Sequence, residues 1–205
     1  KIFIKPSVRA TRHVQQFSMK NDIKTIKSLA TICSKVYQKN KIATVIKHIP
    51  GHGSSSSDSH IKMPIVNHSY QILSKNDFKC FKNINSHFAM TAHILFKKID
   101  PNNVVTHSKK IIEKIIRKKI GFKGIIISDD ISMKALRFDI LKNASKSLAA
   151  GCNLVLYCGG IYSESGNQND IADTLYQCII NEDLSYYFCN NNCYIYFVLL
   201  HEPSI

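Results

Sequence analysis

Hydrophobic positions along the chain follow two spacings, one typical of helices and one typical of buried strands. Residues 21–39 carry apolar side chains at helical spacing, at Ile23, Ile26, Leu29, Ala30, Cys33 and Val36. This segment is therefore expected to form a helix with one face packed on a sheet. The apolar run from Ile42 to Ile46 comes next and predicts a buried strand that ends at Lys47.

The same alternation of helices and strands continues toward residue 158. Helices are predicted for residues 74–86, with Ser74 as the N-cap, for residues 108–121, between the cap Ser108 and the terminator Gly121, and for residues 139–150. Strands are predicted for residues 88–91, 124–128 and 153–158. Such a succession indicates an α/β chain whose strands, beginning near Ala43, Phe88, Gly124 and Asn153, are adjacent and parallel.

The first predicted strand leads into a polar loop, KHIPGHGSSSSDSH, at residues 47–60. Proline, glycines and serines end regular structure there, and the loop contains His48, His52, Asp58 and His60. Asp58 lies two residues before His60, so its carboxylate can accept the imidazole N–H and leave the other ring nitrogen for proton transfer. A metal site and an ordinary polar loop are the alternatives. Zinc ligation has little support, because the loop lacks cysteine and no His-x3-His pair falls on a helix.

Polar residues also follow the later strands. Lys47 and His48, then Thr91 and His93, then Asp129 and Asp130 come at strand ends, and the carboxyl ends of parallel strands in a (β/α) barrel assemble the active site. Asp129 directly follows a β-branched run, where a charged group needs a specific role. For His93 a buried histidine at the core edge is an equal alternative. For Asp130 a helix cap or a supporting role is favoured.

Composition narrows the class of protein. With 205 residues, 44% hydrophobic and 20% charged, the chain has the make-up of one globular domain. It has no apolar run near the roughly 18 residues that span a bilayer, no signal segment opens it, and its seven cysteines form no CxxC pair. These features predict a cytoplasmic protein with free thiols and no membrane partner.

The net charge of +14 raises the question of a nucleic-acid partner. The lysines, however, are spread over the predicted helices, as in SKKIIEKIIRKKIGF, where they alternate with an apolar stripe. We therefore expect solvated helix faces and no nucleic-acid partner, since no recognition motif or aromatic-basic platform accompanies the charge.

Four sequence blocks, taken together, carry a family resemblance. They are KHIPGHG followed by DSH, MTAHILFKKIDP at residues 90–101, GFKGIIISDDISMKAL at 121–136, and AGCNLVLYC at 150–158. In this order and spacing they resemble bacterial β-N-acetylhexosaminidases of glycoside hydrolase family 3, the enzymes of peptidoglycan recycling. The resemblance covers roughly residues 17 to 160.

The resemblance implies a partial TIM-type (β/α) barrel that covers roughly strands 4 to 7 of the family fold. It implies that Asp129 is the nucleophile of a retaining glycosidase, and that His60, oriented by Asp58, is the acid/base. Lys47 and His48 would bind the sugar, and His93 is a further candidate for substrate binding. The implied reaction removes terminal β-linked N-acetylglucosamine from muropeptides, with a saccharide as partner and without a metal or an organic cofactor.

The chain also departs from the family pattern. It begins just before the helix that precedes the fourth strand, so the first three β/α units, with a sugar-binding aspartate and arginine, are expected to be absent. Gln15 and Gln16 stand where the family has another arginine. We expect a partial barrel domain at residues 1–183 and a divergent tail at 184–205. A non-catalytic remnant that retains at most saccharide or partner binding is therefore the alternative function, and the sequence leaves the oligomeric state open.

Overall fold

The computed structural model describes residues 22–55 and 62–157, and its centre is a sheet of four parallel strands. The sheet order is β1 (Val45–Ile49), β3 (Phe88–Thr91), β5 (Ile125–Asp130) and β6 (Leu154–Leu156). All three neighbouring pairs are parallel. The prediction of four adjacent, parallel strands is confirmed.

The principal helices precede or connect these strands and begin and end where the capping residues indicate. Helix α1 (Ile23–Lys39) starts after Asp22, whose carboxylate accepts from the backbone N–H groups of Lys24 and Thr25. Helix α4 (Lys109–Ile111) starts after Ser108 and continues directly into the π-helical segment η3 (Ile112–Ile120), which Gly121 ends at a φ of 83°. Helix α5 (Ile140–Ala150) has Asp139 as its N-cap.

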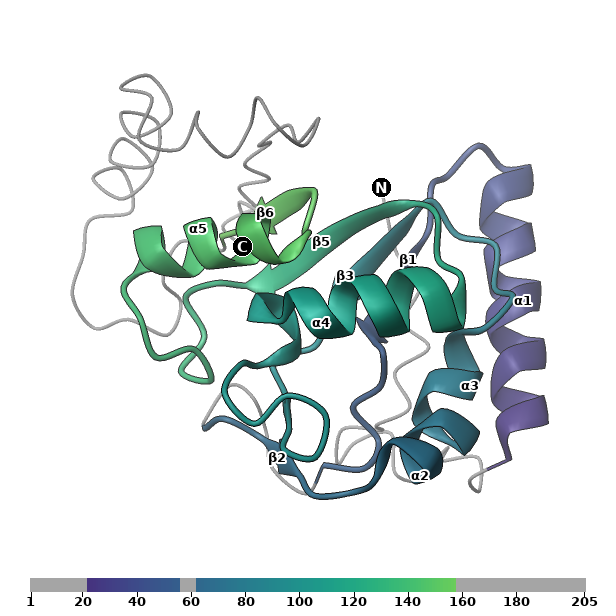
Figure 1. Cartoon of the computed structure of the whole chain (residues 1–205). Coiled ribbons are helices and arrows are strands. Elements are labelled where there is room, and N and C mark those ends of the chain that lie inside the picture. Colours follow the sequence, from purple (N-terminus) through teal and green to yellow (C-terminus); the bar gives the residue numbers. More distant parts are fainter. Residues whose placement is uncertain (1–21, 56–61, 158–205) are drawn as a thin grey trace.

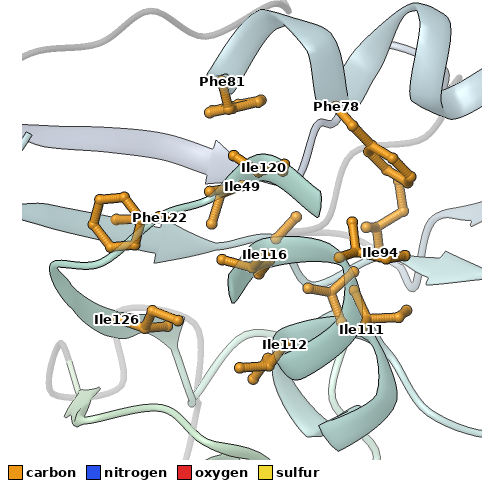
Figure 2. Packing of buried hydrophobic residues seen from close by; sticks show 14 of the residues in the cluster. Ile49, Phe78, Phe81, Ile94, Ile111, Ile112, Ile116, Ile120, Phe122 and Ile126 are labelled. Carbon is orange, nitrogen blue, oxygen red and sulfur yellow. The ribbon is translucent and has the colours of Figure 1, made fainter. Parts of the chain in front are cut away.

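The helices follow one another in the same order as the strands. α1 contacts α3 (Asp77–Phe81), α3 contacts η3, and α4 contacts α5 (Figure 1). Between the helices and the sheet lies a core of isoleucines and phenylalanines, among them Ile49, Phe78, Ile116 and Ile126 (Figure 2). A parallel sheet with a row of helices on its outer side is a sector of a (β/α) barrel, as the sequence predicts.

The two faces of the sheet differ in burial. Ile46, Ala89 and Ile126 point to the helices and are 0–1% exposed, whereas the alternate residues are half-buried or exposed. Lys47, Met90 and Ile127 pair across three strands on this second face. In a closed barrel this face lines the interior, so side chains at its carboxyl end face the barrel mouth.

One predicted helix is wrong. Residues 74–86 form no continuous helix, because α2 (Tyr70–Lys75) ends at Asn76, whose φ of −110° and ψ of −85° are not helical, and α3 begins at Asp77. Ser74 is not a cap, since the α2 cap is Ser69, whose hydroxyl accepts from the Ile72 N–H at 3.4 Å. The inward side chains expected from this segment, Phe78, Phe81 and Ile84, are buried.

Other differences concern strand ends and short elements. β1 begins later than predicted and extends to Ile49, β5 extends to Asp130, and β6 is shorter than residues 153–158, the last of which is not described. A second, two-stranded parallel sheet pairs β2 (Ile65–Val66) with β4 (Leu95–Phe96), and a 3-10 turn, η2 (Val105–His107), precedes α4. The sequence pattern predicted none of these three short elements, because two or three residues are too few to show a period.

The cysteines and the two predicted domains are only partly covered by the described residues. Cys80 and Cys152 are buried and Cys33 is exposed, while the remaining cysteines are not described. The predicted domain at residues 1–183 is described only in part, and the predicted tail at 184–205 lies outside the described residues. No helix among residues 22–55 and 62–157 is long and apolar enough to cross a bilayer.

Candidate active site

The predicted site residues at the end of β1 lie where the strand is irregular. Lys47 pairs with Met90 and Ile49 pairs with Thr91, so His48 is an extra residue in β1. The peptide bonds Lys47–His48 and Ile49–Pro50 are both cis. A bulge changes the direction of the side chain it contains, and bulges are common beside active sites.

A similar irregularity occurs at Asp129. Ile127 pairs with Leu154 and Asp130 with Leu156, so β5 has one residue more than β6 over this interval. Asp129 lies within that interval. By strand alternation it stands on the same face of β5 as Ile127, the face that lines the barrel interior.

The two irregular positions meet. His48 Nε2 lies 3.3 Å from Asp129 Oδ2, and the two side chains are 21% and 14% exposed. The other carboxylate oxygen, Oδ1, accepts the backbone N–H of Asp130 at 2.9 Å. The structure therefore brings together a histidine and an aspartate that are far apart in the sequence.

Burial and charge set the protonation of this pair. Burial lowers the pKa of His48 to about 4, so its imidazole is neutral at pH 7. Burial alone would raise the pKa of Asp129, but His48, His93, the Asp130 N–H and Lys47 together keep that pKa below its usual value. Because His48 is neutral at pH 7, its contribution there is that of a polar neighbour rather than a full charge. Asp129 is an ionised, largely buried carboxylate.

His93 neighbours the His48–Asp129 pair and has no exposed surface. Its Nε2 is 2.9 Å from the carbonyl oxygen of Asp130, so Nε2 carries the proton and donates. Its Nδ1 then accepts from the Thr106 hydroxyl at 2.7 Å, and Thr106 is 2.9 Å from the hydroxyl of Thr91. Both ring nitrogens of His93 are thus engaged within the protein, and its contact with a substrate stays a prediction.

Asp130 supports the turn after β5. Its Oδ1 accepts from the Ser132 N–H at 3.0 Å and its Oδ2 from the Ser132 hydroxyl at 2.8 Å. It does not cap the following helix, because Asp139 caps α5. The supporting role expected for Asp130 agrees with these bonds.

The predicted acid/base residues, Asp58 and His60, lie outside the described residues. The loop that leads to them is described as far as Ser55. Sequence reasoning missed two residues near the site, Thr106 behind His93 and Asp77, which binds Ser54. Neither has a local signal, because each acts through a residue distant in the sequence. Among the described residues, no three His, Cys, Asp or Glu side chains gather as possible metal ligands.

The parallel sheet and its outer row of helices form a sector of a (β/α) barrel. A buried carboxylate and two histidines lie at the carboxyl ends of the strands, where such barrels have their active sites. The profile of the glycosyl hydrolase family 3 N terminal domain matches residues 5–184. The chain belongs to this family.

Named relatives support the assignment. The chain is 32% identical over 159 residues to a beta-hexosaminidase of Methylobacillus flagellatus, covering 75% of this chain and 43% of the relative. It is 37% identical over 139 residues to a beta-hexosaminidase of Nitrosomonas eutropha, covering 65% of this chain and 37% of the relative. The chain therefore spans about two fifths of the length of these relatives.

A solved structure shares the fold. NagZ from Neisseria gonorrhoeae in complex with N-trifluoroacetyl-D-glucosamine is similar with a TM-score of 0.71 and 27% identity. The match covers 86% of this chain and 51% of NagZ. The resemblance stated from the sequence blocks is confirmed at the level of family and fold.

Proposed function

We propose that this chain carries the nucleophile side of a retaining glycoside hydrolase active site and removes terminal β-linked N-acetylglucosamine. The observation that carries the proposal is Asp129, an ionised and largely buried carboxylate at the mouth of the sheet, 3.3 Å from His48. Burying such a charge is costly unless it is held by polar neighbours. Burial of the Asp129 carboxylate fits a catalytic role, because a poorly hydrated carboxylate is a competent nucleophile.

In the first step, the carboxylate of Asp129 attacks the anomeric carbon as the glycosidic bond breaks, and a covalent glycosyl-enzyme forms. His60, with its other ring nitrogen held by Asp58, gives its proton to the departing oxygen. In the second step the neutral His60 takes a proton from water, the water oxygen bonds to the anomeric carbon, and Asp129 leaves. Two inversions give net retention of configuration.

Lys47 and His48 bind the sugar in this proposal. Lys47 stands on the interior face of β1, where its ammonium can donate to sugar hydroxyls. His48 keeps Asp129 oriented, and its neutral ring can exchange its polar contact for one with a hydroxyl group. His93, fixed by Thr106 and the Asp130 carbonyl, holds the end of β5 in place and is a further candidate for substrate binding.

We propose muropeptides as the source of the N-acetylglucosamine, peptidoglycan recycling as the process and the cytoplasm as the location. The relatives named beta-hexosaminidase and NagZ with its bound glucosamine derivative support the sugar class. No metal or organic cofactor takes part in the proposed steps.

The test is release of the phenol from an aryl β-N-acetylglucosaminide by the purified 205-residue chain. Turnover should disappear in Asp129→Ala and persist in Glu113→Ala, which removes an exposed carboxylate from η3. Added azide should restore turnover to Asp129→Ala and give a glycosyl azide of inverted configuration, because the anion occupies the place of the missing nucleophile. Equal turnover in the wild type and in Asp129→Ala would refute the assignment.

The alternative is a non-catalytic remnant that retains saccharide or partner binding. The observation in its favour is that the chain spans about two fifths of the relatives' length, as the 43% and 37% coverages indicate. Catalysis requires precise placement of the sugar, and a displacement of about 1 Å can cost roughly a hundredfold in rate. Absence of turnover, together with saturable binding of N-acetylglucosamine seen in the NMR spectrum of the chain, would favour this alternative.

A further inference from the structure

A set of buried hydrogen bonds connects the turn η2 to the proposed nucleophile. Thr106 in η2 and His93 after β3 both have no exposed surface. The Thr106 hydroxyl lies 2.7 Å from His93 Nδ1, and the other ring nitrogen, Nε2, lies 2.9 Å from the carbonyl oxygen of Asp130. The backbone N–H of Asp130 donates to Asp129 Oδ1 at 2.9 Å. Three segments of the chain are thus joined in one path that ends at the carboxylate.

For a neutral imidazole, the donors and acceptors along this path match in one way. A carbonyl oxygen accepts and never donates, so the bond to Asp130 requires the proton on His93 Nε2, and Nδ1 is then an acceptor. Thr106 is the donor to Nδ1, because its other acceptor, the Ala92 carbonyl oxygen, is farther away at 3.3 Å. The Thr91 hydroxyl, 2.9 Å from that of Thr106, can donate to Thr106 in turn. The ring is therefore held at both nitrogens.

Asp129 depends on this path because strand pairing alone does not fix its backbone. It lies where the register between β5 and β6 shifts, between Ile127 and Asp130. The bond from the Asp130 N–H holds Oδ1, so Oδ2, 3.3 Å from His48, is the oxygen left for attack on the anomeric carbon. A displacement of Asp130 therefore changes the direction in which Oδ2 points.

We propose that Thr106 is a positioning residue for the nucleophile, Asp129. Its hydroxyl keeps the His93 ring aimed at the Asp130 carbonyl, and this bond holds the backbone next to the nucleophile. The inference rests on the proposed function, from which the role of Asp129 is taken. Thr106 has no exposed surface and so touches neither the sugar nor the reacting atoms. Once its donor is removed, the ring gains by turning toward another one, and turning breaks the bond to Asp130.

The first measurement is NMR of the ¹⁵N-labelled chain at pH 7. In the wild type, Nε2 of His93 should have the chemical shift of a protonated nitrogen, and Nδ1 that of an unprotonated nitrogen that accepts a hydrogen bond. Thr106→Val should move the Nδ1 signal, whereas Thr106→Ser, which keeps the hydroxyl, should leave it near its wild-type position. A wild-type ring with its proton on Nδ1, or on both nitrogens, would overturn the proposal whether or not the variants fold.

The second measurement follows the nucleophile itself. Titration of the Asp129 carboxyl group by ¹³C NMR should give a higher pKa in Thr106→Val than in the wild type, because the N–H bond to Oδ1 loosens while burial remains. Thr44→Val is the matched control. It removes another fully buried hydroxyl, 2.9 Å from Ser86 Oγ, just before β1 and therefore at the opposite end of the sheet. This control should lose stability without changing the titration of Asp129.

Activity on an aryl β-N-acetylglucosaminide separates positioning from binding. In Thr106→Val, kcat should fall roughly ten- to a hundredfold, because a nucleophile displaced by about 1 Å attacks poorly. KM should change by less than about threefold, since contacts with the bound sugar are kept. Thr106→Ser should recover most of kcat, and Thr106→Cys, whose thiol is a weaker donor, only part of it. Thr44→Val should keep kcat within about threefold of the wild type.

A Thr106→Val chain with the kcat and the Asp129 titration of Thr44→Val would overturn the proposal. If Thr106→Val does not fold, Thr106→Cys replaces it and the same two comparisons decide. Wild-type chain without turnover would instead refute the proposed function. The titration then decides alone: an Asp129 pKa that is equal in the wild type and the variant would remove the positioning role, and a raised one would support it.

Discussion

Arg117 offers a test of how β5 is held in register, because it connects three segments of the chain. Its Nη1 donates to the carbonyl oxygens of Gly124 at 2.6 Å and Phe122 at 3.2 Å, and its Nη2 donates to Asn153 Oδ1 at 2.8 Å. Asn153 Oδ1 also accepts the backbone N–H of Ile126 at 2.9 Å. Unlike the neighbouring exposed lysines of η3, this side chain is half-buried, and it connects η3 to the segments that lead into β5 and β6.

Replacing Arg117 by methionine keeps most of the apolar stem and removes these three hydrogen bonds. Hydrogen bonds to charged groups contribute about 1.5–3 kcal/mol each. Water reaches a half-buried site and replaces part of that, and Asn153 keeps its bond to Ile126. We therefore expect the free energy of unfolding to fall by about 3 kcal/mol in total, well below the full sum.

The measurement is urea unfolding of the purified chain at pH 7, followed by far-UV circular dichroism. Lys118→Met is the matched control, since it makes the same change of charge at the next, exposed position, and it should stay within about 0.5 kcal/mol of the wild type. Arg117→Lys should lie between the two, because an ammonium keeps the charge but cannot reach all three oxygens. If Arg117→Met unfolds at the same urea concentration as Lys118→Met, the network contributes nothing to stability.

Three further predictions concern the site. In His48→Leu the pKa of Asp129 should rise, because the carboxylate loses a polar neighbour while the site stays buried, and a ¹³C NMR titration of the carboxyl group should detect it; an unchanged or lower pKa would contradict the assigned contact. Stability should decline as the pH falls from 6.5 to about 4, since burial lowers the pKa of His48 and His107 to about 4 in the folded chain, whereas the unfolded chain takes up these protons near pH 6.5. By pH 4.5 the loss is about 2–3 kcal/mol for each histidine, and thermal unfolding of His107→Phe should show about half the total pH dependence. Thr106→Val leaves Nδ1 of His93 without its donor and should cost about 1–3 kcal/mol in urea unfolding, with Thr31→Val at a half-buried position of α1 as the comparison; equal costs would show that the buried hydrogen bonds of Thr106 are not needed.

The sequence by itself determined the order of the elements and much of their extent. Phe88–Thr91 was predicted with its observed bounds, and Ser108, Asp139 and Gly121 end or begin helices as their residue types indicate. These features depend on residues within a few positions of one another. Periodicity and capping report such short-range interactions directly. The strand order followed because parallel β/α units leave few alternatives.

The candidate site was predictable as a location but not as a set of contacts. Asp129 and His48 both follow strands predicted from the sequence, and the carboxyl ends of parallel strands share one edge, so their convergence could be expected. That His48 Nε2 is 3.3 Å from Asp129 Oδ2 depends on an extra residue in each of β1 and β5, which no local pattern shows.

Only the tertiary structure decided what the remaining polar residues do. His93 is enclosed by Thr106 and the Asp130 carbonyl, and Asp77, the first residue after the break in a predicted helix, accepts the hydroxyl of Ser54. Each partner lies 13 to 37 residues away in the chain. Their proximity comes from sheet register and helix packing, where many weak contacts over the whole domain fix a distance that no single segment encodes.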